Sequence, residues 1–257
     1  MGILQSGRMW ASSATYLNDP SELVYAVELI SGQLKAQAQQ ASRELEKELW
    51  KRAALGVSGA ESQGTFLTCF CEEDDLLSQW RGYGAREDGF SLVFDADRIG
   101  TRPDRGFELR RVIYKPAEQL TLITECLQAA RRAVGRLRAN EGDQLSVVSA
   151  FLSDHLHELI FAFKNPAFHE EKEWRAVHST VEREIGRILL RPTDGVVLIP
   201  YVEVDLAWRS DLDLLPLRHI RIGPNPNRAL AERAVIHLLQ KHGYDHVDIQ
   251  QTSIPLR

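Results

Sequence analysis

Three charged residues alternate along one short stretch of the chain: Glu171, Glu173 and Arg175. Side chains two positions apart in a β-strand point to the same face of the sheet, so a strand here would present two carboxylates and a guanidinium together. Two close carboxylates push each other's pKa values apart, which is how enzymes divide acid and base roles. The same alternation is typical of a solvated strand face with a cross-strand arginine pair, and spacing alone favours this second interpretation.

No metal is expected at this stretch. Residues 169–173 read HEEKE, and Glu173 stands where the zinc signature His-Glu-x-x-His requires its second histidine. An alternative function does need a metal: a nuclease or phosphate-ester hydrolase would hold Mg²⁺ with Asp19, Glu22, Glu171 and Glu173. These carboxylates lie far apart in the chain, so only the fold can bring them to one point.

A second candidate constellation is the run SQWRGYG, which contains Trp80, Arg81 and Tyr83. It lies between a predicted strand and a glycine-rich turn, a position that can present side chains into a cleft. Guanidinium groups bind phosphates and aromatic rings stack on flat ligands, so these residues are candidates for substrate binding. The competing interpretation places Trp80 and Tyr83 in the core and Arg81 on the surface. The residue types leave both interpretations open.

A third candidate is the run IRIGPNPN, which includes Gly223 and Asn225. A strand that passes through a glycine into the start of a helix exposes backbone N–H groups, and these can accept an anion. An ordinary strand-to-helix connection is the favoured interpretation, because the run lacks the glycine-rich fingerprint of a phosphate loop or a dinucleotide-binding turn.

Composition excludes several classes of protein. The chain has 257 residues, of which 44% are hydrophobic and 26% charged, so it can bury the core of a globular domain. Its formal net charge of -5 gives no general attraction to nucleic acid or to an anionic membrane surface. No apolar run is long enough to cross a bilayer. Three scattered cysteines indicate a reducing compartment, and we expect a cytoplasmic protein.

The order of predicted elements indicates one α+β domain over residues 1–257, with a mixed or antiparallel twisted sheet. Asp19, Pro20 and Glu22 are typical of a helix start and predict a long N-terminal helix that reaches about Leu55. A helical insertion is expected across about 116–165. Strands are expected at 65–72, 89–95, 107–114, 172–179, 185–191, 196–205, 217–222 and 246–250, with the first two paired to each other.

The order of several motifs resembles a bacterial family known as domain of unknown function twenty-nine seventy-one. The motifs are MWASS, LNDP, CFCEEDDLLSQWRGYG, GFSLVFD, F-x-x-E-x-E-W-R, IRIGP and the closing SIPLR, and they span nearly the whole chain. Members usually open with one further strand before the position of Gly2, which is expected to be missing here. Their arrangement is similar to the ADP-ribosyltransferase fold.

This resemblance implies an enzyme that uses NAD as its substrate, such as a toxin or phage-defence effector that modifies a protein or nucleic acid. It implies that Glu173 or Glu171 stabilises the ribosyl cation formed as nicotinamide leaves. It places Tyr83 or Trp80 in the nicotinamide pocket. In such a site the guanidinium of Arg175 is expected to act as a bidentate clamp that holds one of the two carboxylates ionised and oriented. The remaining substrate-binding candidates are Arg81, Asn18, Asp19 and Glu22.

A third functional class also fits the sequence, a binding module without catalysis. The predicted helix 20–55 and the insertion would then supply a surface for a partner. A helix that exposes an apolar stripe would favour this class, and a helix packed entirely on the sheet would count against it.

Overall fold

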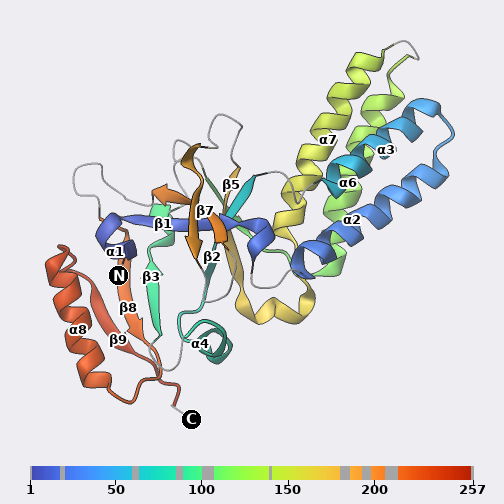
Figure 1. Ribbon diagram of the computed structural model, residues 1–257. Coiled ribbons are helices and arrows are strands. Elements are labelled where there is room, and N and C mark those ends of the chain that lie inside the picture. Colours follow the sequence, from blue (N-terminus) through green and yellow to red (C-terminus); the bar gives the residue numbers. More distant parts are fainter. Residues whose placement is uncertain are drawn as a thin grey trace.

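The computed structural model describes residues 2–17, 21–59, 64–84, 89–99, 107–138, 141–179, 186–192, 198–205 and 214–255. Within them the strands form two sheets, one with the order β4-β5-β2-β1-β7-β6 and one with the order β3-β8-β9. A group of long helices extends away from the larger sheet, on the side opposite the smaller one (Figure 1). The predicted α+β class is confirmed.

The larger sheet is antiparallel at every paired edge. Its strands are β1 (Arg8–Ser13), β2 (Thr65–Cys71), β4 (Glu108–Arg111), β5 (Glu173–Ser179), β6 (Leu189–Pro192) and β7 (Leu198–Asp205). The central pair β2 and β5 is held over seven residues, from Thr65 opposite Ser179 to Cys71 opposite Glu173. Residues directly opposite each other in an antiparallel pair point to the same face. Cys71 therefore shares a face with Glu173, and Cys69 with Arg175.

The smaller sheet contains β3 (Phe90–Phe94), β8 (Leu217–Ile222) and β9 (Asp248–Gln251). Strand β3 pairs antiparallel with β8, and β8 pairs parallel with β9 across the helix α8 (Arg228–Lys241). The predicted pairing of the strand at 89–95 with the strand at 65–72 is therefore wrong. Ile220 and Ile222 of β8 are buried with Val235 and Leu239 of α8, and this shared core outweighs closeness in the sequence.

Four long helices pack against one another beside the larger sheet (Figure 1). They are α2 (Ser21–Gln40), α3 (Glu44–Ser58), α6 (Pro116–Gly135) and α7 (Gly142–Ala162). The last two form the predicted helical insertion. Their core includes Ile30, Leu49, Trp50 and Leu156, each at most 1% exposed. Helices of this length are stable chiefly because such apolar faces are buried.

The predicted helix over 20–55 is two helices, α2 and α3. The chain turns between Gln40 and Glu44, and not at Gly32, which lies inside α2. Arg43 has an extended backbone at this corner, and its guanidinium donates to the carbonyl oxygens of Gly135 at 3.2 Å and Leu137 at 2.9 Å. These bonds tie the corner between α2 and α3 to the end of α6, a segment that is distant in the sequence.

Five shorter elements complete the described chain: α1 (Gly2–Ser6), η1 (Ala14–Tyr16), α4 (Leu77–Tyr83), α5 (Ala96–Ile99) and η5 (Pro166–Glu171). Helix α4 carries Trp80, Arg81 and Tyr83, and η5 ends at Glu171, just before Glu173. Ser78 of α4 donates from its hydroxyl to Glu170 of η5 at 3.3 Å, so these two elements lie side by side. No helix among the described residues is long and apolar enough to span a bilayer.

Glycines surround the ring of Trp80 where α4 meets the smaller sheet. A Cβ on Gly223 would lie 2.8 Å from two ring carbons of Trp80, and a Cβ on Gly89 would lie 3.3 Å from them. The indole N–H of Trp80 donates to Asp75 at 2.9 Å, so the ring is held in place from its other side. Trp80 is 9% exposed. The tryptophan thus anchors α4 to the sheet.

We expect Gly223→Ala to lower the free energy of unfolding by about 1–3 kcal/mol, because a methyl group forced against a held ring overpacks the site. Urea denaturation measures the change. Gly32→Ala is the matched control: a Cβ at Gly32 meets nothing within 4 Å, and alanine is the better helix former, so stability should stay or rise. Equal stability of both variants would mean that Trp80 is free to move.

Candidate functional site

A cluster of five charged side chains joins the helices to the larger sheet. Glu173 and Arg175 come from β5, Glu171 from the end of η5, Lys164 from the segment after α7, and Glu22 from the first turn of α2. The ammonium of Lys164 lies 2.8 Å from Glu22, 2.6 Å from Glu171 and 2.8 Å from Glu173. The guanidinium of Arg175 binds both oxygens of Glu173, at 2.8 and 3.1 Å, and also binds Glu22.

The centre of the cluster is almost completely removed from water. The side chains of Arg175, Glu173 and Lys164 are 2%, 4% and 5% exposed. Buried charges are tolerated only when they are paired and hydrogen-bonded, and each of these groups has several partners. Three carboxylates and two cations leave the cluster with one net negative charge. The internal pairing explains why these charges can be buried, and the excess charge makes the electrostatic potential around the cluster negative.

Glu173 has a strongly perturbed pKa. Burial raises the pKa of Glu173, but the hydrogen bond and charge of Arg175 and the charge of Lys164 outweigh burial and hold the pKa at about 2. Burial lowers the pKa of Lys164, and the surrounding carboxylates, Glu173 foremost, raise it overall well above its usual value. Both groups are therefore charged at neutral pH.

The alternation predicted for residues 171–175 holds only in part. Glu171 ends η5, and Lys172 has a positive φ of 43° before β5 begins at Glu173. Glu171 is therefore not in the strand, and its inclusion in the strand pattern was wrong. The turn nevertheless returns its carboxylate to Lys164. With its side chain 21% exposed, Glu171 is more accessible than Glu22, at 10%, or Glu173, at 4%.

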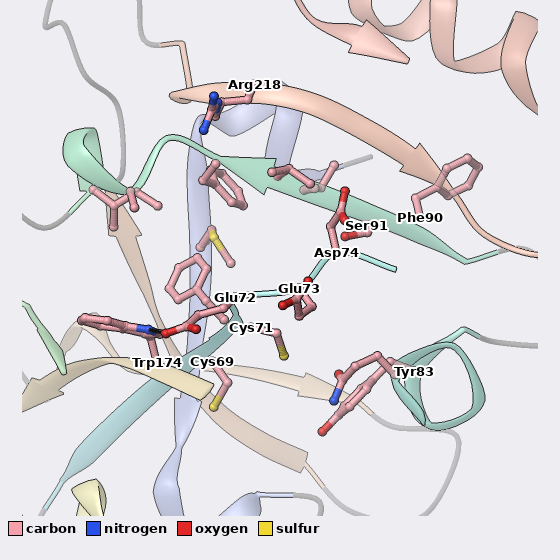
Figure 2. A pocket seen from close by; sticks show the side chains of 18 of the residues that line it. Cys69, Cys71, Glu72, Glu73, Asp74, Tyr83, Phe90, Ser91, Trp174 and Arg218 are labelled. Carbon is pink, nitrogen blue, oxygen red and sulfur yellow. Dashed lines mark hydrogen bonds between the residues drawn. The ribbon is translucent and has the colours of Figure 1, made fainter. Parts of the chain in front are cut away.

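A cavity of about 870 Å³ lies between the two sheets and is shown in Figure 2. Rings and aliphatic side chains from both sheets form much of its wall, and α4 adds Trp80 and Tyr83. Tyr83 is 66% exposed, so its ring is available to a ligand. Among the described residues the wall includes Cys69, Phe70, Cys71, Glu72, Glu73, Asp74, Gln79, Phe90, Ser91, Leu92, Phe94, Asp97, Trp174 and Arg218.

Two cysteines connect this cavity with the charged cluster. Cys69 and Cys71 line the cavity, and they share a face of the sheet with Arg175 and Glu173. Burial, then the charges of Glu171 and Glu173, raise the pKa of Cys71 to about 11. Cys69 is exposed, yet desolvation of its thiol, followed by the charge of Glu173, raises its pKa as well. Glu171 and Glu173 are not wall residues themselves; they lie behind these two thiols.

The other predicted site residues fall in different places. Glu22 belongs to the charged cluster, whereas Arg81 is exposed on α4. Asn18 and Asp19 lie outside the described residues. The Gly223 N–H donates to the carbonyl of Gly89 at 2.9 Å, so this amide is already occupied.

Asn225, the other half of the predicted anion site, is 7% exposed. Its side-chain oxygen accepts from the backbone N–H of Asn227 at 2.6 Å. This bond closes the turn that leads into α8. The amides of Gly223 and Asn227 therefore both donate to groups of the chain itself, and these hydrogen bonds occupy donors that an anion would need.

The carboxylates proposed for a metal converge on a cation that belongs to the protein. Glu22, Glu171 and Glu173 all contact the Lys164 ammonium. Within the described part of the chain, no group of three or more His, Cys, Asp or Glu side chains has an arrangement that could hold a metal ion.

Lys164 and Arg218 are the residues that sequence reasoning missed. Lys164 lies directly before Asn165-Pro166 at the end of a helix, where a lysine has no distinctive local pattern. Its partners are set by the fold, because α2 and β5 meet at this point; Arg175 and Glu22 are 153 positions apart. For Arg218 the sequence offered one indication, its place on the predicted strand LRHIRI that leads into the glycine and proline of the third candidate run.

Comparison with known proteins finds a match to one family model. Residues 79–176 match the family model described as Protein of unknown function (DUF2971). The matched segment contains Trp80, Tyr83, Glu171, Glu173 and Arg175, so the resemblance drawn from the motifs is confirmed over this part of the chain. Neither the curated proteins nor the solved structures contain a match.

Proposed function

We propose that the chain is an enzyme that cleaves NAD at the bond between nicotinamide and ribose, and passes the ADP-ribosyl group to a macromolecule or to water. The observation that carries this proposal is the negatively charged cluster behind the wall of an aromatic-lined cavity. The resemblance of the motifs to a family with an ADP-ribosyltransferase-like arrangement points to the same chemistry. A protein or a nucleic acid is the proposed acceptor.

The chemistry requires a negative environment. When the glycosidic bond breaks, its electron pair moves to the ring nitrogen and neutralises the pyridinium, while positive charge develops on the ribose. A carboxylate placed near that ribose stabilises charge that exists only in the transition state, and such an interaction accelerates the reaction. Glu173 contributes its negative charge to the cluster at neutral pH, because its pKa is about 2.

The residues take separate roles in this proposal. We assign the stabilising charge to Glu171, which would act on the ribose from behind the cavity wall and is the most exposed of the three carboxylates. Glu173 and Arg175 are positioning residues, because both are buried and bound to each other. Tyr83 offers an exposed ring at the cavity wall, and aromatic faces attract a flat cation such as the nicotinamide of NAD.

We expect Glu171→Gln to reduce nicotinamide release from NAD by roughly 100-fold or more, the usual cost of removing one group that stabilises transition-state charge. Purified protein is incubated with NAD and with cell lysate as a source of acceptors, and free nicotinamide is measured. NAD labelled in its adenylate then shows whether the ADP-ribosyl group reaches protein, nucleic acid or water.

Glu170→Gln is the matched control, because Glu170 is the exposed neighbour in η5 and lies outside the cluster. This variant should release nicotinamide as the wild type does. If Glu171→Gln released nicotinamide at the wild-type rate, Glu171 would not be the group that stabilises the ribosyl cation. No turnover by the wild type, with and without lysate, would contradict the proposed function.

A further inference from the structure

We infer that Arg218 makes one side of the cavity a binding site for phosphate groups, so that the ligand is a pyrophosphate-bearing dinucleotide held at both ends. This inference rests on the proposed function and specifies how that site recognises its substrate. It assigns a role to a side chain that neither the motifs nor the charged cluster explains.

Arg218 is a cation at the cavity without a protein partner in the described chain. It lies on β8, is exposed, and belongs to the cavity wall. The described residues contain no hydrogen bond or ion pair to its guanidinium. The neighbouring cation of the same strand behaves differently, because Arg221 binds Asp74 at 2.8 Å and Gln250 at 2.7 Å. Among the described wall residues, Arg218 is also the only lysine or arginine.

Three consecutive acidic residues of the wall do not compete for this guanidinium, because each has its own partner. Glu72 accepts from the Trp174 indole at 3.0 Å, and Glu73 binds Lys172 at 2.7 Å. Asp74 binds His219 at 2.6 Å as well as Arg221. The planar guanidinium of arginine presents several N–H groups in a fork that matches phosphate oxygens. An unengaged fork at a cavity wall is suited to such a ligand.

The position of Arg218 relative to Tyr83 gives the cavity two chemically different ends. Figure 2 shows Arg218 on the opposite side of the cavity from Tyr83 and Cys69. The Tyr83 side has an exposed ring and, behind the cysteines, the negative cluster, so it suits a flat cation. The Arg218 side suits an anion. A nicotinamide riboside joined to a pyrophosphate has this distribution of charge.

Binding of three probes separates the two ends: NAD, nicotinamide riboside without phosphate, and ADP-ribose without the nicotinamide ring. Calorimetric titration of Arg218→Ala should show NAD and ADP-ribose bound at least about tenfold more weakly, as expected for a lost charge-assisted hydrogen bond. Binding of nicotinamide riboside should stay at the wild-type level. Arg218→Lys keeps the charge but loses the fork, and should fall between the two proteins.

Tyr83→Ala should give the complementary result, with weaker binding of NAD and nicotinamide riboside and unchanged binding of ADP-ribose. Arg228→Ala, at an exposed arginine of α8 outside the cavity wall, is the control and should bind all three probes as the wild type does. Thermal unfolding of each variant confirms that it is folded.

The outcomes distinguish this inference from the function on which it rests. If Arg218→Ala binds ADP-ribose as tightly as the wild type, or loses all three probes equally, the inference is overturned even where NAD turnover is intact. Failure of the wild type to bind ADP-ribose overturns it as well. Binding of ADP-ribose that depends on Arg218, without any cleavage of NAD, supports the phosphate site and contradicts the proposed function.

Discussion

Arg175→Ala is expected to lower the free energy of unfolding by about 3–5 kcal/mol, the cost of breaking a buried ion pair from one side. The substitution leaves Glu173 without the two bonds from the guanidinium and takes a partner from Glu22. The carbonyl of Phe161, at the end of α7, also loses its donor at 3.2 Å. Because these partners belong to β5, α2 and α7, the junction of helices and sheet should weaken as a unit.

Urea denaturation followed by circular dichroism measures this change. Lys47→Ala provides the control, because Lys47 and Glu44 form an ion pair on the exposed face of α3, and such pairs contribute at most about 1 kcal/mol. Arg175→Lys retains the charge without the fork and should lie between the alanine variant and the wild type. If the free energy of unfolding of Arg175→Ala lies within about 1 kcal/mol of the wild-type value, the charged cluster does not hold the junction together.

Acid is expected to remove about 3 kcal/mol of stability through Glu173 alone. Its pKa is about 2 in the folded chain against an ordinary value of 4.5. A carboxyl whose pKa is depressed by folding contributes its full stabilisation above the ordinary pKa and loses it as the pH falls through the folded pKa. The loss therefore falls between about pH 4.5 and pH 2, and the difference between the two pKa values sets its size.

The measurement compares the wild type with Glu173→Gln by urea unfolding at several pH values from 7 to 2. The variant has no carboxyl at this position, so the stability difference between the two proteins should shrink by about 3 kcal/mol across this range. Glu170→Gln, at an exposed neighbour, should follow the wild type throughout. Parallel curves for the wild type and Glu173→Gln would show that the Glu173 carboxyl titrates alike in the folded and unfolded chain.

Much of the secondary structure could be predicted because its signals are local. Pro116 begins α6 and Gly142 begins α7, close to where the sequence placed the insertion. The β-branched and aromatic run TFLTCFC forms β2. The corner between α2 and α3 could not be predicted, because it contains no proline or glycine and its arginine binds carbonyls of α6.

The candidate site was predicted in part. Glu173 and Arg175 share a strand face, as their spacing indicated, and Tyr83 lines a cavity. The spacing did not reveal that Glu171 precedes the strand or that Lys164 neutralises part of the acidic group. Nor did it separate the exposed ring of Tyr83 from that of Trp80, which is held between Asp75 and glycines. Burial decides such roles, and burial depends on residues distant in the chain.

By itself the sequence determined the α+β class, most element positions, and the family resemblance that residues 79–176 bear out. These properties follow from periodicity, turn residues and motif order, which act over a few neighbouring positions. The tertiary structure alone decided that β3 pairs with β8, that five charged groups meet at one junction, and that Arg218 faces a cavity. Strand pairing and charge compensation join segments far apart in the chain, so their outcome depends on the packed whole.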